Sequence, residues 1–208
     1  MSRPRHADDG CGRKGTQSVF LMKTDAHLYY DLEDYLSEVA HRRFHKNGWI
    51  GAFDFFSIVI WKANRAKSYT ANRIRRISSK KNLEQISRKI TKSLWQAKDD
   101  KEKMRILVSK WEFQLPMASA ILTILYPNRF TIYDYRAAEQ IRDNSKLGAK
   151  TDFEVIWRGY LNFKERVKKI GIGKTLREKD RYLFGKSRME DLRRDIKSGF
   201  KKRRKTSA

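Results

Sequence analysis

Apolar residues recur along this chain with the spacing of helices rather than strands. The two clearest stripes are formed by Leu83, Ile86, Ile90 and Leu94, and by Phe153, Ile156, Trp157, Tyr160 and Val167. Residues three and four positions apart share one face of a helix, whereas a half-buried strand alternates strictly between apolar and polar positions. Such alternation is scarcely visible, so the pattern predicts an all-α fold.

The periodic segments predict helices over about 25–45, 50–67, 69–78, 83–98, 100–110, 117–126, 133–144 and 152–170, with one or two more near the C-terminus. Three predicted helix starts carry a capping box, in which a hydroxyl and a carboxylate satisfy the first free amides of the helix. These boxes pair Thr151 with Glu154, Thr175 with Glu178, and Ser187 with Glu190.

The ends of the chain differ in composition from its middle. Residues 1–23 are largely polar and glycine-rich and predict a disordered basic arm, whereas the run of Lys and Arg in 199–208 predicts a solvated basic tail. We expect 24–198 to form one helical domain with two lobes. Cys11 is the only cysteine, which excludes an intramolecular disulfide and a cysteine-rich zinc site.

The charge of the chain is strongly positive. Its 48 Lys and Arg residues outnumber 24 Asp and Glu residues, which gives a net charge of +24. This excess is typical of proteins that bind DNA or RNA and, less often, an anionic membrane surface. No apolar run approaches the roughly 20 residues of a membrane span, and no signal segment follows the N-terminus. We therefore expect a cytoplasmic, nucleoid-associated protein.

The stretch from Trp111 to Arg136 contains the strongest candidate for a catalytic residue. It predicts a tight turn, an almost wholly apolar helix from Met117 to Tyr126, a Pro-Asn turn, and then Asp134 at the start of the next helix. In a chain this basic, a carboxylate placed beside a buried helix is a candidate catalytic group facing a polyanion. An Asp at a helix start is also commonly just the cap of that helix.

Two other motifs indicate no chemistry. Gly173-Lys174-Thr175 resembles the end of a phosphate-binding loop, but a helix precedes it where that loop requires a strand. The residues instead predict a glycine helix stop followed by a Thr cap. His41 and His45 lie four positions apart among basic residues, and without a third ligand they predict an exposed basic helix face.

The segment F-D-F-F-S-I-V-I-W-K-A-N-R-A-K, beginning at Phe53, resembles the second helix of the helix-hairpin-helix DNA glycosylase superfamily. In that family, F-E-x-L-x-x-x-I-L-x-x-Q ends on a residue that fills the gap left by a flipped nucleotide, and Asn64 matches it here. The family then places a hairpin of the type L-P-G-V-G-x-K-T before a catalytic aspartate. Aligning its next helix with Ala118 puts Pro116 at the lysine and Asp134 at the aspartate, eighteen residues on.

Two departures from the family pattern matter. The hairpin glycines correspond to Glu112 and Gln114, so the helix-hairpin-helix is degenerate, and the lysine that forms a Schiff base is replaced by Pro116. The resemblance, which covers residues 53–136, therefore implies a monofunctional DNA glycosylase with a cleft between two lobes. Asp134 would stabilise an oxocarbenium-like sugar and orient the attacking water.

The resemblance and the composition together assign the remaining roles. The flipped base needs an aromatic pocket, for which the candidates are Trp61, Trp111, Tyr133 and Tyr135. The candidates for nucleic-acid contact are Asn64, Lys67, Lys110, Gln114 and Arg136. Arg136 could also pair with Asp134 and hold it in place. We expect a monomer acting on duplex DNA without a metal or other cofactor.

Alternatives from other classes stay open. The chain could be a non-catalytic DNA- or RNA-binding module, or an RNA-processing factor whose basic face meets ribosomal RNA. A glycosylase could act in repair or in defence against phages with modified DNA. The discriminating observation is whether Asp134 lies open in a cleft flanked by aromatic and basic side chains.

Overall fold

The computed structural model describes residues 29–79 and 81–200, and all regular elements within them are helices. This confirms the all-α prediction. The predicted arm at 1–23 and residues 201–208 of the predicted tail lie outside the described residues. The buried side chains between Tyr35 and Leu183 form one continuous hydrophobic core. The division into two lobes stays a prediction.

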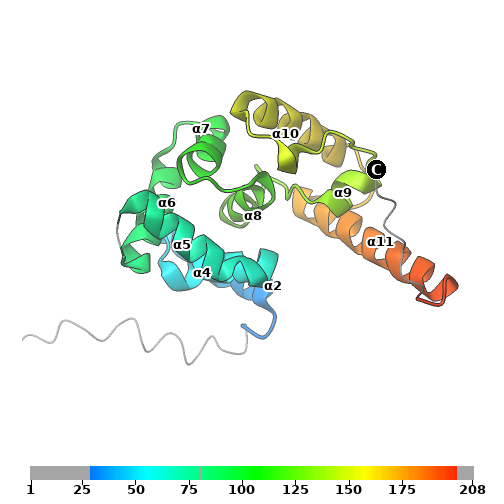
Figure 1. Ribbon diagram of the computed structural model, residues 1–208, viewed down its shortest axis with the longest axis horizontal. Coiled ribbons are helices and arrows are strands. Elements are labelled where there is room, and N and C mark those ends of the chain that lie inside the picture. Colours follow the sequence, from blue (N-terminus) through cyan, green and yellow to red (C-terminus); the bar gives the residue numbers. More distant parts are fainter. Residues whose placement is uncertain (1–28, 80, 201–208) are drawn as a thin grey trace, which may run out of the picture.

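The first half of the described chain forms a layer of helices around the core (Figure 1). A long helix opens it, in which α2 (Leu32–Tyr35), a π-helical turn η1 (Leu36–Ala40) and α3 (His41–Asn47) follow without a break. After α3 come α4 (Ala52–Ala63), the 3-10 turn η2 (Asn64–Ala66), α5 (Lys67–Ser78) and α6 (Leu83–Gln96). The Asp31 carboxylate caps α2, so this helix starts later than the predicted position 25.

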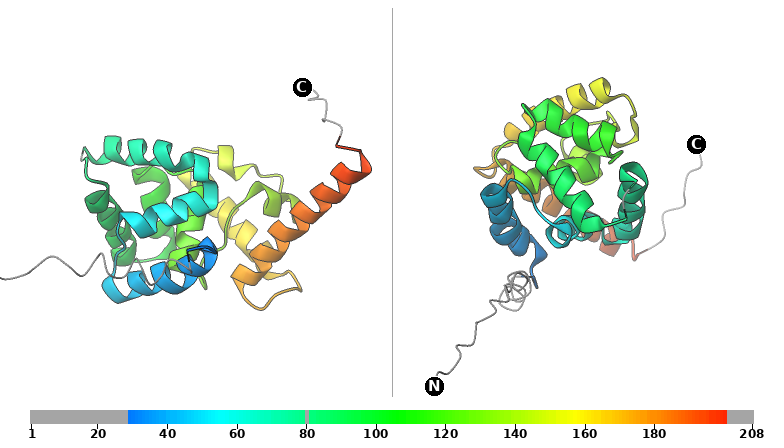
Figure 2. Two further views of the ribbon diagram at one scale, coloured as in Figure 1. Left: turned by 90° about the horizontal axis from the view of Figure 1, so that it is seen from below. Right: turned by 90° about the vertical axis from the view of Figure 1, so that its left-hand side faces the viewer.

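The second half begins with α7 (Asp100–Arg105), which continues into a π-helical turn η3 (Ile106–Lys110). A short turn over 111–114 leads to α8 (Leu115–Leu125), followed by α9 (Tyr135–Gln140), the 3-10 turn η4 (Leu147–Ala149), α10 (Phe153–Lys168) and α11 (Leu176–Lys197). Pro116 lies in the first turn of α8, where its missing amide would have no helical partner. In Figure 2 the last turns of α11 extend away from the other helices.

Helix α8 lies at the centre of the fold and contacts α3, α4 and α7. All its residues from Ala118 to Leu125 are buried. The small side chains of Ala118, Ser119 and Ala120 let neighbouring helices approach closely. A helix that is apolar on every side is stable in water only when other elements enclose it, so α8 organises the packing of the rest.

The free carbonyls at the C-terminal end of α8 are satisfied by two histidines of α3. His41 Nδ1 lies 3.0 Å from the carbonyl oxygen of Ile124, and His45 Nε2 lies 2.9 Å from that of Leu125. Burial lowers the pKa of His41, which favours the neutral ring with its proton on the donating nitrogen. The prediction of an exposed basic face is wrong for His41, which is half-buried against the end of α8, whereas His45 is exposed.

One of the three predicted capping boxes is present. The Thr175 hydroxyl accepts from the amide of Glu178 at 3.1 Å, and the Glu178 carboxylate accepts from the Thr175 amide at 3.0 Å. The box at Thr151 is wrong, because Asp152 caps α10 by accepting from an amide at 2.8 Å. The box at Ser187 is also wrong, because this residue lies buried within α11.

Two glycines inside helices differ in the space around them. A Cβ on Gly159 in α10 would lie 2.4 Å from a methyl carbon of the buried Leu147, whereas a Cβ on Gly185 in α11 would meet no atom within 4 Å. We expect Gly159→Ala to lower the free energy of unfolding by roughly 1–3 kcal/mol through overpacking. Gly185→Ala should raise it by roughly 0.5–1 kcal/mol, because alanine favours the helix.

Urea unfolding followed by circular dichroism measures both variants against the wild type. Each glycine serves as the control for the other, since both changes add one methyl group to a helix. Changes of the same sign in the two variants would contradict this account of the packing.

Candidate functional site

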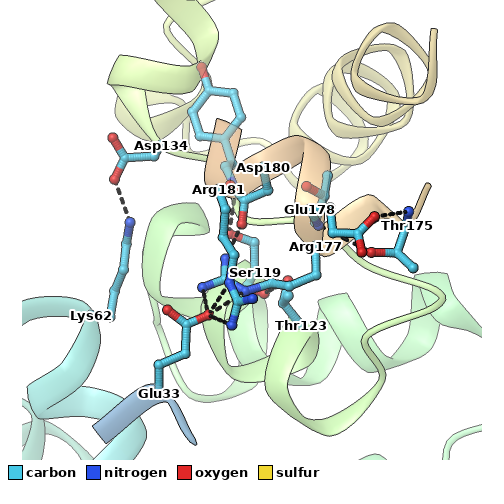
Figure 3. Close-up of polar contacts among 12 residues, drawn as sticks. Glu33, Lys62, Ser119, Thr123, Asp134, Thr175, Arg177, Glu178, Asp180 and Arg181 are labelled. Carbon is cyan, nitrogen blue, oxygen red and sulfur yellow. Dashed lines mark hydrogen bonds and ion pairs between the residues drawn. The ribbon is translucent and has the colours of Figure 1, made fainter. Parts of the chain in front are cut away.

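A pocket of about 250 Å³ lies between α2, the end of α4, the segment before α9 and the first half of α11. One side is formed by Trp61 and Lys62 at the end of α4, and by Asp134 just before α9. Glu33 of α2 and one face of α11 complete the wall. Figure 3 shows the charged side chains of these elements directed toward a common space.

Asp134 is held at this pocket by contacts to both of its carboxylate oxygens. Its Oδ1 accepts from the backbone amide of Arg136 at 3.0 Å, which makes Asp134 the cap of α9. Its Oδ2 accepts from Lys62 Nζ at 2.5 Å, and both side chains are about 15% exposed. The carboxylate therefore has a fixed orientation and a cationic partner at the pocket wall.

The extended segment before α9 is fixed by hydrogen bonds to neighbouring helices. The Tyr160 hydroxyl of α10 donates to the Thr131 carbonyl at 2.8 Å and accepts from the Thr131 amide at 3.0 Å. The Ser119 hydroxyl of α8 accepts from the Tyr133 amide at 2.9 Å. Because the backbone is anchored on both sides, Asp134 reaches the pocket from a rigid support.

The opposite wall is a network of ion pairs between α2 and α11. The Glu33 carboxylate accepts from Arg177 Nε at 2.9 Å and from Arg181 Nε at 2.7 Å. Arg177 also donates to Asp180, one turn along α11. The Arg177 guanidinium lies 5.0 Å from the centroid of the Trp61 ring, close enough for a cation-π interaction.

Asp180 is the most deeply buried carboxyl group of the pocket, at 3% exposure. Burial raises its pKa to about 6, although the neighbouring Arg177 acts in the opposite direction. Asp180 can therefore exist in either protonation state near neutral pH, whereas a solvated aspartate is fully ionised there.

The aromatic residues expected in the base pocket are dispersed. Trp61 lines the pocket, together with Phe184, which the sequence did not indicate. Trp111 and Tyr133 do not line it, because both are buried in the core, and the Tyr133 hydroxyl accepts from the Leu147 amide. Tyr135 is 66% exposed on a different surface hollow, beside α11.

The residues expected to contact nucleic acid are mostly exposed. Asn64 and Lys67 lie together after α4, where Lys67 Nζ donates to Asn64 Oδ1 at 3.1 Å. Lys110 and Gln114 are exposed, one just before and one at the end of the turn over 111–114. Arg136 does not pair with Asp134 through its side chain, because its guanidinium is turned toward Asp191 of α11.

The turn before α8 has one feature of a glycine turn without containing a glycine. Glu112 has a left-handed backbone with φ of 54°, which is uncommon for a residue with a side chain. Arg73 of α5 donates to its carbonyl, and Arg76 NH2 lies 2.5 Å from its carboxylate. Two guanidinium groups thus lie beside this turn.

Sequence reasoning missed the contribution of α11 to the pocket. Arg177, Asp180, Arg181 and Phe184 all line it. Their spacing of three, one and three residues places them on one face of a helix, a signal that was present in the sequence. Glu33 carried no comparable signal, because its partners lie more than 140 residues away.

Comparisons with known protein families, curated proteins and solved structures found no match to this chain. In the described part of the chain, no helix is long and apolar enough to cross a membrane. No group of three His, Cys, Asp or Glu side chains in the same part is arranged to hold a metal ion. The pocket and the charge around it are therefore the features that bear on function.

The raised pKa of Asp180 has a consequence for stability. Folded protein retains this proton between about pH 4 and pH 6, whereas the unfolded chain releases it, so the contribution of Asp180 to the free energy of unfolding should fall as pH rises through this window. Asp180→Asn should remove roughly 3 kcal/mol of this pH dependence.

Urea unfolding of wild type and variant at several pH values measures this difference. Asp195→Asn, an exposed position of the same helix, controls for the loss of one carboxylate. Parallel curves for wild type and Asp180→Asn would contradict the assignment.

Proposed function

We propose that the protein is a DNA glycosylase, which removes a damaged or modified base by hydrolysing the bond between base and sugar. The observation that carries the proposal is the position of Asp134, whose carboxylate lines a pocket with aromatic walls in a chain of net charge +24. The pocket, at about 250 Å³, is slightly smaller than typical sites for drug-sized ligands and suits a single base.

The proposed reaction breaks the bond from C1′ to the base nitrogen and forms a bond from C1′ to a water oxygen. As the base departs, positive charge develops on the sugar, and a carboxylate near C1′ stabilises that charge. Asp134 is suited to this role because the Arg136 amide and Lys62 fix its direction. The released base carries away a proton, and water supplies the new hydroxyl group.

The target base must first leave the helical stack and enter the pocket. Trp61 and Phe184 offer apolar surfaces against which it could stack. Asn64, exposed just after α4, is the residue proposed to occupy the hole in the duplex. The two-lobed arrangement, the degenerate hairpin and its neighbouring arginines belong to the same proposal, in which basic side chains contact the phosphates.

A binding module without catalysis is the second candidate. It is favoured by the engagement of both Asp134 oxygens, one as a helix cap and one with Lys62. In this reading the carboxylate only joins α4 to α9, and the basic surface contacts DNA or RNA phosphates. A glycosylase should lose base release when Asp134 loses its charge, whereas a binding module releases no base in either form.

Asp134→Asn should abolish base release while DNA affinity stays equal or rises, because a negative charge near the phosphates is removed. An asparagine oxygen can still accept from the Arg136 amide, so the cap of α9 is retained. Single-turnover release of bases from duplexes that carry varied lesions, detected by mass spectrometry, measures the effect. Asp191→Asn, which removes a carboxylate partner of Arg136 outside the pocket, is the matched control.

A wild-type protein that releases no base from any lesion-bearing duplex, yet binds DNA, would favour the binding module. Near wild-type release by Asp134→Asn would leave the glycosylase intact and reject Asp134 as its catalytic residue.

The products should be intact abasic sites, with strand breaks only after alkali or heat. The resemblance places Pro116 where the family has its Schiff-base lysine, and the amine nearest to Asp134 is Lys62, at 2.5 Å. Borohydride trapping followed by denaturing electrophoresis measures this. A trapped adduct that disappears in Lys62→Arg would show instead that Lys62 acts as a nucleophile.

A further inference from the structure

The end of α11 carries apolar side chains that are about half exposed. Met189, Leu192 and Ile196 are 49, 54 and 60% exposed, and every residue over 192–200 is exposed. Figures 1 and 2 show this end projecting beyond the neighbouring helices. Isolated helical turns are marginal in water, so a helix end of this kind gains stability from a partner.

The spacing of these residues is that of a coiled-coil seam. Gly185, Met189, Leu192 and Ile196 are separated by four, three and four residues, the alternation of a heptad repeat. At 100° of rotation per residue, these four residues fall within an arc of about 60° around the helix axis. The centre of this stripe, which we call the α11 seam, is opposite Leu183 and Ser187, the buried side of the helix.

Charges of opposite sign flank the α11 seam. Arg188 and Asp195 occupy equivalent positions one heptad apart, beside the apolar stripe. Among the described residues neither Asp195 nor Arg188 forms an ion pair, and the Arg188 guanidinium lies 5.8 Å from the centroid of the Phe184 ring. When two copies of this helix run antiparallel, Arg188 of each copy can face Asp195 of the other.

We propose that the α11 seam binds the same seam of a second copy of this chain, with the two helices antiparallel. In this arrangement Met189 packs beside Leu192 of the second copy, and Gly185 leaves room for Ile196 of the second copy. Arg188 lies near Asp195 of the second copy, and the two-fold symmetry repeats each contact. The seam spans about 17 Å at 1.5 Å per residue, which is short for a coiled coil, so the dimer is weak and concentration-dependent.

A membrane surface suits this face less well. A helix that lies on a membrane has a wide apolar face and a polar face rich in Lys and Arg. The α11 seam is narrow, includes a glycine, and is flanked by the acidic residue Asp195. Its carboxylate would be repelled by anionic lipids, whereas a second copy offers Arg188 to it.

Sedimentation equilibrium of the full, nuclease-treated chain tests the proposal. The average mass should rise with concentration from 24.7 kDa toward twice that value. Leu192→Lys and Ile196→Lys should each weaken association by about tenfold or more, because a charge replaces a side chain of the seam. Both positions are exposed, so the circular dichroism of each variant should match that of the wild type.

Ile172→Lys is the matched control, because it makes the same change at a position 52% exposed but distant from the seam in the sequence. It should associate as the wild type does. Arg188→Asp should weaken association, and the double variant with Asp195→Arg should restore it, since each ion pair then forms with its charges exchanged.

A wild-type chain that stays at the mass of one copy throughout the concentration range would overturn the proposal. Undiminished association of Leu192→Lys would overturn it as well. Monomeric protein that sediments with anionic phospholipid vesicles, and loses this binding in Leu192→Lys, would assign the face to a membrane surface instead. None of these outcomes depends on base release, so the dimer and the glycosylase can fail separately.

Discussion

The burial of α8 is the constraint on which the rest of the structure depends. Its apolar side chains require enclosure on every side, and α3, α4 and α7 supply it. The backbone groups at its C-terminal end must be satisfied as well, and His41 and His45 do so. Ser119 of α8 also fixes the segment before α9, because its hydroxyl accepts a hydrogen bond from the amide of Tyr133, next to Asp134. The candidate catalytic carboxylate is therefore positioned by the core itself.

The fold was largely predictable because helical periodicity is a local signal. The stripes at 83–94 and 153–167 lie within α6 and α10, and the apolar run after Pro116 is α8. Errors arose where tertiary contacts decided the outcome. Ser187 matched a cap by its spacing, yet the demand for a buried face kept α11 continuous through it.

The pocket was less predictable than the fold, because its walls come from segments far apart in the sequence. Asp134 and Trp61 both line it, while their catalytic and base-binding roles stay predictions. Trp111 was an aromatic candidate for its wall, but burial of a large ring in the core stabilises the fold more than exposure at a pocket. Pairings such as Glu33 with Arg177 depend on topology, which one sequence without relatives does not reveal.

The separation of Glu33 and Arg177 also determines when the site can form during synthesis. Domains begin to fold from the N-terminal side as the chain is made. The helices around α8 can pack once the chain has passed residue 125, yet the pocket still lacks the wall that α11 provides. Glu33 must remain without its arginines until the chain has extended by more than 140 further residues. A nascent chain that stops before α11 would therefore have most of its core and no closed pocket.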